Sequence, residues 1–320
     1  MPTATTKFPV SQPSCPWLVF NHGEKEGYSS QTFVNVAQDC YDVASIPEMR
    51  NKLICTSCHG WLVLLDKESF DCFLLNPVSM EKIMLPQVSS QVIPFNTCIL
   101  SSAPTGPDCA VIFLRPKTPC VTFLRLGEES EWIEQDLISE EIIRQAIVCQ
   151  GKIYGFNFPG YLCTVKIVGS NLVVTQLGAE EIPMYTIPDA FRRWFRLVES
   201  CGELFAVAKY YQGGTMKTRH IEVYKMDFPR LAWTKVESLG NRAFFLACNS
   251  CNFSCAAVPG SVVKQNCIYF LESGDRDLHV FDMENYDVTI STPCPVKSNW
   301  LQPTWVMPAR SISATTNDSG

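Results

Sequence analysis

Cysteine and histidine are the residue types whose spacing in this chain could support chemistry. Zinc binds four nitrogen or sulfur ligands in a tetrahedron, and each of two cysteine groups could supply about half of such a set. The two groups lie far apart in the sequence: Cys55-x2-Cys58-His59 and Cys248-x2-Cys251-x3-Cys255. They could meet only through the fold, so the sequence favours buried or loop cysteines over a zinc site.

A cysteine nucleophile would need a base within reach of its thiol. Cys58 and His59 are adjacent, and adjacent residues on a strand point to opposite faces, which prevents direct activation. His59 is therefore predicted to be a structural side chain before Gly60. The segment from Cys248 to Cys255 is the better candidate for exposed reactive thiols.

The remaining polar groups have simple structural explanations. His22, His220 and His279 are each isolated in the sequence, and His279 alternates with apolar residues as one face of a strand would. A local acidic group resembles only a fragment of a calcium loop, so a solvated turn is favoured. Its members are Glu272, Asp275, Asp277 and Asp282.

The run Phe191-Arg192-Arg193-Trp194-Phe195-Arg196 combines basic and aromatic side chains. Arginine and tryptophan dominate interface hot spots, so a protein-binding patch is one interpretation. The favoured one is that Trp194 and Phe195 begin a strand. The sequence contains no Walker loop, dinucleotide-binding fingerprint or serine-hydrolase elbow. We therefore predict no catalytic, cofactor-binding or metal-ligating residue and no cofactor.

Composition narrows the class of protein further. The 320 residues are 46% hydrophobic, which excludes a disordered chain, and the net charge of −6 without a basic run argues against nucleic acid as a partner. No apolar stretch reaches the ~18 residues that span a bilayer, so no membrane association is expected. The first residues lack the apolar core of a secretory signal, and they contain no arginine, so organelle import is not favoured. We expect a reducing compartment, the cytoplasm or nucleus, in which the sixteen cysteines mostly act as small buried hydrophobes.

The stretch from Ile54 to Pro86 indicates how the chain folds. It predicts three short strands, at Trp61–Leu65, Cys72–Leu75 and Ile83–Leu85, and the first is apolar on both faces. One antiparallel meander cannot bury its own apolar faces, so it needs neighbours of the same kind.

Similar blocks follow along the chain, each with a strand, a small-residue turn and an aromatic strand. Three of these units are Gly151–Phe156, Gly202–Val207 and Asn266–Leu271. Their spacing is close to the length of a propeller blade, and predicted helix is scarce, so the sequence predicts an all-β propeller of about six blades. Strands within Trp17–Val36 and Trp300–Met307 are expected to pair as the sixth blade and close the ring.

The predicted domain layout is simple. Residues 1–14 are expected to be a disordered arm, residues 15–308 a single β-propeller and residues 309–320 a disordered tail. Gln38–Asn51 is predicted to be a connection with a short helical turn near Pro47–Lys52, and Leu137–Arg144 has a weak helical pattern. In the fifth block, the apolar run AFFLAC is predicted to be the first strand, followed by a long polar loop that carries cysteines.

At the level of whole motifs the chain resembles the plant F-box-associated β-propeller family of the KIB type, long labelled a domain of unknown function. The matching stretches run in the family's order from Ile54 to the closing PTWVMP: SCHGWLVLLD, FLLNPVSMEKIMLP, VESCGELFAVAKYY, IEVYKMDFPRLAWTKVESLGNRAFFL and NCIYFLES…LHVFDMEN.

The resemblance implies a non-enzymatic propeller that binds a protein target, as the substrate-binding domain of an F-box ubiquitin-ligase adaptor does. The residues before Trp17 carry no amphipathic helical pattern, so no F-box is recognised and binding to the ligase scaffold adaptor is not expected. The alternative is a cysteine- or metal-dependent hydrolase on a propeller scaffold.

Overall fold

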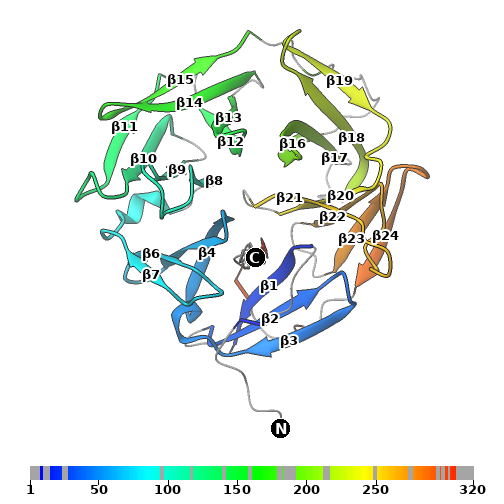
Figure 1. Cartoon of the computed structure of the whole chain (residues 1–320), viewed down its shortest axis with the longest axis horizontal. Coiled ribbons are helices and arrows are strands. Elements are labelled where there is room, and N and C mark those ends of the chain that lie inside the picture. Colours follow the sequence, from blue (N-terminus) through cyan, green and yellow to red (C-terminus); the bar gives the residue numbers. More distant parts are fainter. Residues whose placement is uncertain are drawn as a thin grey trace, which may run out of the picture.

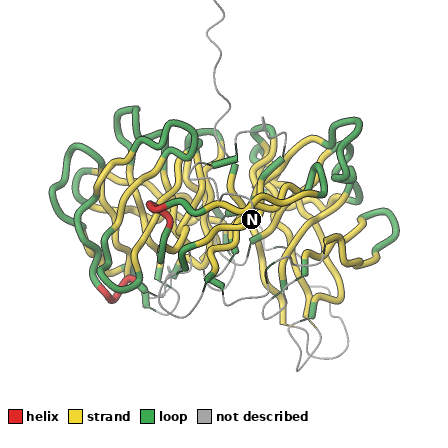
Figure 2. Tube along the Cα trace, turned by 90° about the horizontal axis from the view of Figure 1, so that it is seen from below, coloured by secondary structure: helices red, strands yellow, loops and turns green. Residues whose placement is uncertain are grey.

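Six β-sheets surround a central axis in the computed structural model of the chain (Figure 1). The structure describes residues 8–9, 15–23, 28–93, 97–115, 118–138, 142–157, 161–178, 182, 192–211, 217–247, 251–272, 277–292, 296, 300–301 and 303–307. Seen edge-on, the strands cross the thickness of the ring and the turns gather at its two faces (Figure 2). The predicted six-bladed propeller is confirmed.

Each of the first three blades is a four-stranded sheet, and its strands are named from the centre outwards. Blade 1 contains β25 (Thr304–Val306), β1 (Trp17–His22), β2 (Ser30–Asn35) and β3 (Cys40–Ala44). Blade 2 contains β4 (Lys52–Cys58), β5 (Trp61–Asp66), β6 (Cys72–Leu75) and β7 (Lys82–Met84). Blade 3 contains β8 (Thr97–Leu100), β9 (Ala110–Leu114), β10 (Cys120–Arg125) and β11 (Ile133–Asp136).

The other three blades continue around the ring. Blade 4 contains β12 (Ile143–Cys149), β13 (Lys152–Asn157), β14 (Leu162–Val168) and β15 (Asn171–Gln176). Blade 5 contains β16 (Arg192–Ser200), β17 (Glu203–Tyr211), β18 (Thr218–Asp227) and β19 (Ala232–Val236). Blade 6 contains β21 (Phe253–Ala256), β20 (Arg242–Leu246), β22 (Cys267–Leu271), β23 (Leu278–Asp282) and β24 (Asp287–Thr292).

The two ends of the propeller meet in blade 1, as predicted. β25 lies antiparallel to β1, with Trp17 opposite Val306 and Val19 opposite Thr304. A single bridge between His22 and Trp300 extends this contact. Because the last strand completes the first blade, β1 is paired on both of its edges.

A core of buried side chains fills each interface between neighbouring blades. Leu18 and Phe20 of β1 pack toward blade 6, whereas Trp17 and Val19 of the same strand pack toward blade 2. Alternate side chains of a strand point to opposite faces, so each blade contributes to two cores. This arrangement explains why β5 is buried along its whole length and why a lone meander could not fold.

The innermost and outermost strands of the first two blades differ from prediction. β4 adds an innermost strand to the three predicted for Ile54–Pro86, and β3 lies within Gln38–Asn51, predicted as a connection. β4 mixes small polar and cysteine residues because it borders the central channel. β3 is an edge strand and exposes four of its five residues, so neither strand has a strong apolar pattern.

Blade 6 departs from the regular pattern because it holds an additional strand. The predicted first strand of this block is β20, which runs parallel to β22. The innermost position belongs to β21, which pairs antiparallel with β20 and lies in the segment predicted as a long polar loop. β20 is therefore inserted between the first and second strands of an otherwise standard blade.

Helix is limited, in the described part of the chain, to two 3-10 turns at Pro47–Met49 and Ser90–Val92. The first confirms the helical turn predicted near Pro47–Lys52. The helical alternative for Leu137–Arg144 is wrong at its described positions, because Ile143 and Arg144 begin β12 and residues 139–141 lie outside the described set. Within the described residues, no helix has the length and apolar character needed to cross a membrane.

Candidate functional site

A hollow of about 1060 Å³ opens on one face of the ring, at the ends of the innermost strands. Turns and strand ends from blades 2, 5 and 6 form its wall, and Met307 follows the closing strand into it. A smaller space of about 280 Å³ shares Cys58, Glu199 and Met307 with it and continues between the innermost strands of blades 2, 3 and 4. The hollow is therefore the mouth of the central channel.

Tight turns between first and second strands bring two blades to the rim. His59-Gly60 joins β4 to β5 with φ values of 52° and 77°, and Cys201-Gly202 joins β16 to β17 with φ values of 54° and 77°. Two consecutive left-handed residues are the requirement of a type I′ hairpin turn, whose twist matches that of the strands. Glycine supplies the second position without steric cost, so these short turns project His59 and Cys201 at the rim.

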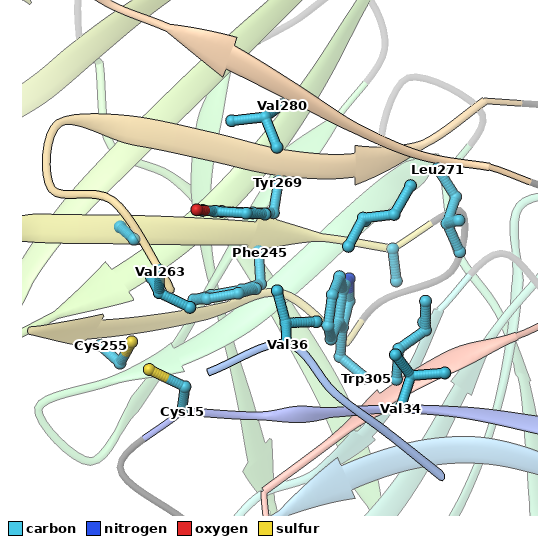
Figure 3. Close-up of a cluster of buried hydrophobic side chains, with 14 of the residues drawn as sticks. Cys15, Val34, Val36, Phe245, Cys255, Val263, Tyr269, Leu271, Val280 and Trp305 are labelled. Atoms are coloured by element: carbon cyan, nitrogen blue, oxygen red, sulfur yellow. The ribbon is translucent and has the colours of Figure 1, made fainter. Parts of the chain in front are cut away.

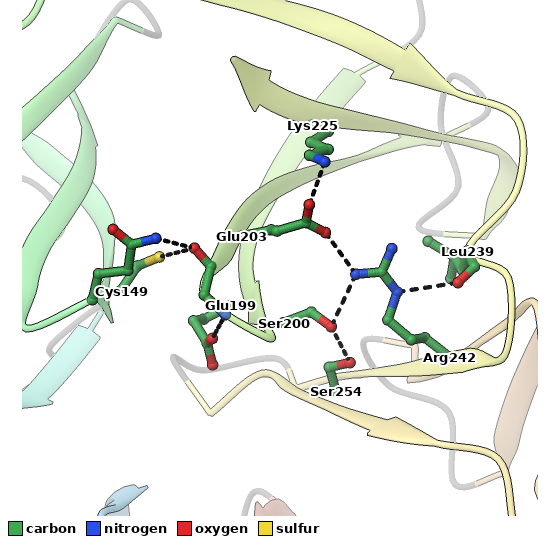
Figure 4. Close-up of polar contacts among 10 residues, drawn as sticks. Cys149, Glu199, Ser200, Glu203, Lys225, Leu239, Arg242 and Ser254 are labelled. Atoms are coloured by element: carbon green, nitrogen blue, oxygen red, sulfur yellow. Dashed lines mark hydrogen bonds and ion pairs between the residues drawn. The ribbon is translucent and has the colours of Figure 1, made fainter. Parts of the chain in front are cut away.

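Arg242 organises the wall between blades 5 and 6 (Figure 4). Its Nη1 atom donates to Glu203 Oε2 at 2.9 Å and to Ser200 Oγ at 3.4 Å, and Ser200 Oγ lies 2.8 Å from Ser254 Oγ. Lys225 also forms an ion pair with Glu203. Hydrogen bonds from Lys225 and Arg242 hold the pKa of Glu203 below its usual value, so the carboxylate stays charged at neutral pH.

A second set of hydrogen bonds ties the Cys201-Gly202 turn to blade 4. Gln150 Nε2 donates to the Gly202 carbonyl at 2.7 Å, and the thiol of Cys149 lies 3.6 Å from the same oxygen. The Gly202 N–H donates in turn to Glu199 Oε1 at 2.7 Å. The rim is thus held in place by side chains of two blades.

Of the described residues in the second predicted half zinc site, Cys251 is the one that the fold places against the strand carrying the first half site. Cys251 lies beside β4, where its sulfur accepts from the Ser57 N–H at 3.2 Å and lies 3.7 Å from Thr56 Oγ1. Cys251 and Cys255 belong to the core between blades 6 and 1, whereas Cys55 and Cys58 belong to the core between blades 2 and 3. Cys248 lies outside the described residues. Among the described residues, no three histidine, cysteine or acidic side chains are placed to hold a metal ion.

The buried thiols of Cys58 and Cys251 near the channel are protonated at neutral pH. Burial raises the pKa of Cys58 to about 12 and that of Cys251 to about 11. Because the thiolate is the nucleophile and the metal ligand, such thiols react and coordinate poorly. The prediction of exposed reactive thiols in the Cys248–Cys255 segment is wrong for Cys251 and Cys255, which are buried. The described cysteines that are exposed are Cys40 and Cys201.

Comparison with known proteins assigns the chain to a family. Residues 33–282 match the model of a protein family described as "KIB1-4 beta-propeller". This chain belongs to the KIB1-4 β-propeller family. The predicted resemblance to a plant F-box-associated propeller is confirmed.

The curated relatives of this KIB1-4 propeller are named as F-box proteins. An F-box/kelch-repeat protein of Arabidopsis thaliana is 28% identical over 91% of this chain and 74% of its own length. An F-box protein of the same plant is 31% identical over 80% of this chain and 68% of its own length. Another F-box protein aligns over only 45% of its own length. A solved nidogen/laminin complex has a chain with 9% identity and a TM-score of 0.40, covering 92% of this chain and all of that one.

The remaining histidines of the KIB1-4 propeller have structural contacts. The ring of His59 hydrogen-bonds to carbonyls of Leu100 and Ser101 in blade 3, so it turns away from the neighbouring Cys58, and burial lowers its pKa. His22 Nε2 lies 2.7 Å from Thr32 Oγ1. The ring of His279 stacks on Phe270, with centroids 5.6 Å apart.

His220 belongs to a polar cluster whose side chains all come from blade 5. The buried carboxylate of Glu222 accepts from Tyr210 at 2.6 Å, Tyr224 at 2.9 Å and Lys235 at 3.0 Å, while His220 Nε2 lies 3.7 Å away. Burial alone would raise the pKa of Glu222, but these hydrogen bonds outweigh it and lower the pKa. The cluster satisfies one buried charge and joins strands β17, β18 and β19.

The acidic group of the sequence is divided between the two ends of a strand pair, with Glu272 and Asp277 at one end and Asp282 at the other. Glu272 follows β22 and accepts from the Thr218 N–H at 2.7 Å, whereas Asp282 ends β23 and accepts from the Glu284 N–H at 2.8 Å. The strand pair places Leu271 opposite Leu278 and Cys267 opposite Asp282, so the two acids lie at opposite ends of the blade. Asp275 lies outside the described residues.

From Arg192 onwards the basic-aromatic run lies in β16, in agreement with the favoured interpretation of the sequence, and Phe191 lies outside the described residues. Phe195 packs against Phe156 with centroids 5.4 Å apart, and Trp194 is 46% exposed beside the guanidinium of Arg196. Arg196 Nε also donates to the Ala247 carbonyl at 3.2 Å.

The sequence does not mark Cys201 as a rim residue, and the Cys-Gly pair at a predicted turn is the signal that could have found it.

Proposed function

We propose that this chain is a non-enzymatic protein-interaction propeller that holds a target protein as the substrate-binding part of an F-box ubiquitin-ligase adaptor would. The observation that carries the proposal is membership of the KIB1-4 β-propeller family together with relatives named as F-box proteins. We further propose that the target docks in the hollow at the mouth of the channel.

The shape and chemistry of the hollow support this choice of docking site. Its volume of about 1060 Å³ is at the upper end of small-molecule pockets, so it can take a protein segment of several residues. Its wall is fixed by the Arg242 network, and its rim exposes His59, Cys201, Asn241 and Val258. A fixed wall with exposed turn residues is the usual way in which a scaffold presents a binding surface.

The alternative of a cysteine- or metal-dependent hydrolase has less support. The Cys58 thiol is protonated at neutral pH because burial raises its pKa to about 12, and the ring of His59 bonds to backbone carbonyls of blade 3. A thiol without a base at hand is a weak nucleophile. We therefore propose binding without chemistry on the target.

Val258→Glu is expected to reduce target capture at least tenfold. Val258 is 44% exposed on the wall, and a carboxylate there would either be desolvated by the target or repel an acidic segment. Tagged wild-type chain and variant would be used to capture proteins from plant extract, with quantitative mass spectrometry as the readout. Val168→Glu is the matched control, because Val168 is a 61% exposed valine of β14 outside the hollow.

The pattern across the two variants decides the docking site. A protein retained by wild type and Val168→Glu and lost by Val258→Glu is the expected target. Equal retention by all three proteins would contradict docking at the hollow. Equal loss in both variants would show that the capture follows net charge and not this surface.

The same chain is expected not to retain the scaffold adaptor of plant ubiquitin ligases. Every described strand belongs to one of the six blades, so the described residues offer no helical module for that contact. A pull-down with purified adaptor, beside an F-box-bearing relative as positive control, measures this directly. Stoichiometric, salt-resistant binding would overturn this part of the proposal. We place the protein in the cytoplasm or nucleus, where such ligases act on their targets.

A further inference from the structure

Two cysteine thiols meet at the boundary where the ring closes. Cys15 lies two residues before β1, and Cys255 lies in β21, the innermost strand of blade 6. Both are buried, at 2% and 8% exposed, within the core between blades 6 and 1. Their sulfur atoms point toward one another (Figure 3), and the two thiols are hydrogen-bonded.

We propose that Cys15 and Cys255 are a redox modification site at which an intramolecular disulfide forms and closes the propeller ring covalently. The bond would join residues that are far apart in the sequence but in contact in the fold. It would lie beside the β25–β1 contact, in which three residue pairs and the neighbouring His22–Trp300 bridge hold the closing segment. This inference does not depend on the proposed target or on its docking site.

The surroundings of the pair permit a defined order of events. Cys255 lines the hollow and is the more exposed of the two residues, so it is the one that an oxidant entering the channel mouth meets first. Cys15 does not line the hollow and belongs to the core cluster that also contains Val36 and Tyr269. Cys255 is thus the attacking residue and Cys15 the resolving one.

The oxidant is a low-molecular-weight disulfide, for which oxidised glutathione is the probe. The Cys255 thiol loses its proton and attacks one sulfur of the probe, which breaks the probe's S–S bond and releases one glutathione thiol. The Cys15 thiol then loses its proton and attacks the Cys255 sulfur, which releases the second glutathione thiol. Two protein thiols are oxidised, and one glutathione disulfide is reduced to two thiols.

The protonation of the pair sets the rate of this exchange. The hydrogen bond with Cys15, together with burial, raises the pKa of Cys255. Only the thiolate attacks a disulfide, so the reaction is slow at neutral pH and its rate should rise about tenfold per pH unit below the pKa. The site is therefore expected to form a structural disulfide slowly. It differs from a fast peroxide sensor, whose cysteines have low pKa values.

The test uses the full 320-residue chain, treated with oxidised glutathione and compared with chain kept under dithiothreitol. Peptide mapping by mass spectrometry is expected to find the Cys15–Cys255 linkage. The melting temperature is expected to rise by about 5–10 °C, because a bond that closes a long loop restricts the unfolded chain. Dithiothreitol should reverse both results.

Variants separate this pair from the other thiols. Cys15→Ala and Cys255→Ala should each abolish the linkage and the rise in melting temperature. Cys267→Ala is the matched control, because Cys267 is equally buried in the same core and should keep both results. Since the alanine variants could fold poorly, the wild type is also scored by alkylation under denaturing conditions without reductant, in which oxidation should lower the number of free thiols by two.

The proposal fails if oxidation of the wild type gives no Cys15–Cys255 peptide. It also fails if the rise in melting temperature persists in Cys15→Ala, because another cysteine pair or glutathione adduct would then be responsible. A mixed glutathione adduct on Cys255 that never resolves would equally overturn it, since the geometry requires Cys15 to complete the bond.

Discussion

Trp305→Ala is expected to lower the free energy of unfolding by about 3–5 kcal/mol, because a large buried ring is replaced by a cavity. Trp305 is fully buried in β25, a strand of only three residues. Its ring packs edge-on against Phe245 of blade 6, with centroids 5.0 Å apart. The loss is expected to weaken the closure of the ring as well as one core, since the same strand completes blade 1.

Chemical denaturation of wild type and variant measures this effect, and hydrogen exchange locates it. Amides of β1 and β25 should lose protection more than those of blade 4 on the far side of the ring. Trp194→Ala removes the same side chain from a 46% exposed position and should cost much less. A loss below about 0.5 kcal/mol in Trp305→Ala would show that the closing strand contributes little.

A second variant at this position tests why a tryptophan occupies it. The indole N–H of Trp305 is buried and finds no acceptor among the described residues. Phenylalanine keeps most of the apolar volume and removes that unsatisfied donor, so Trp305→Phe should cost far less than Trp305→Ala. If the two variants lose the same stability, ring volume is not the quantity that holds the closing strand.

The propeller could be predicted from the sequence because each blade repeats the same physical requirement. Strands such as β5 and β6 are buried on both faces between neighbouring blades, so they form continuous apolar runs in the sequence. The turns between strands need left-handed residues, and the Gly151 and Gly202 positions reveal them. Closure of the ring could also be predicted, because the first and the last predicted strands of the chain each lacked a partner within the repeated blocks.

The site could not be predicted in the same way, because its residues serve the channel and not the cores. β4 and β21 border the channel with small, polar and cysteine side chains, so their periodicity is weak. The contact of Cys251 with Ser57 joins residues from two blades, and no local pattern encodes such a meeting. The inserted β20 also shifted the innermost strand of blade 6 into a segment whose sequence is typical of a loop.

Trp61→Ala should also reduce stability by about 3–5 kcal/mol, and it tests blade 2 independently of ring closure. Trp61 begins β5 directly after the His59-Gly60 turn and is 4% exposed in the core between blades 2 and 3. That core is separate from the one that contains Trp305, so the two losses should add in the double variant within about 0.5 kcal/mol.

Denaturant unfolding of the two single variants and the double variant gives the three values needed. Met84→Ala in β7 of the same blade is the control, because Met84 is 59% exposed and should cost about 0.5 kcal/mol or less. A Trp61→Ala loss as small as that of Met84→Ala would refute the central position of β5. A loss in the double variant well below the sum would show that disrupting one blade interface already destabilises the other. The stability of the blade interfaces would then depend mainly on closure of the ring.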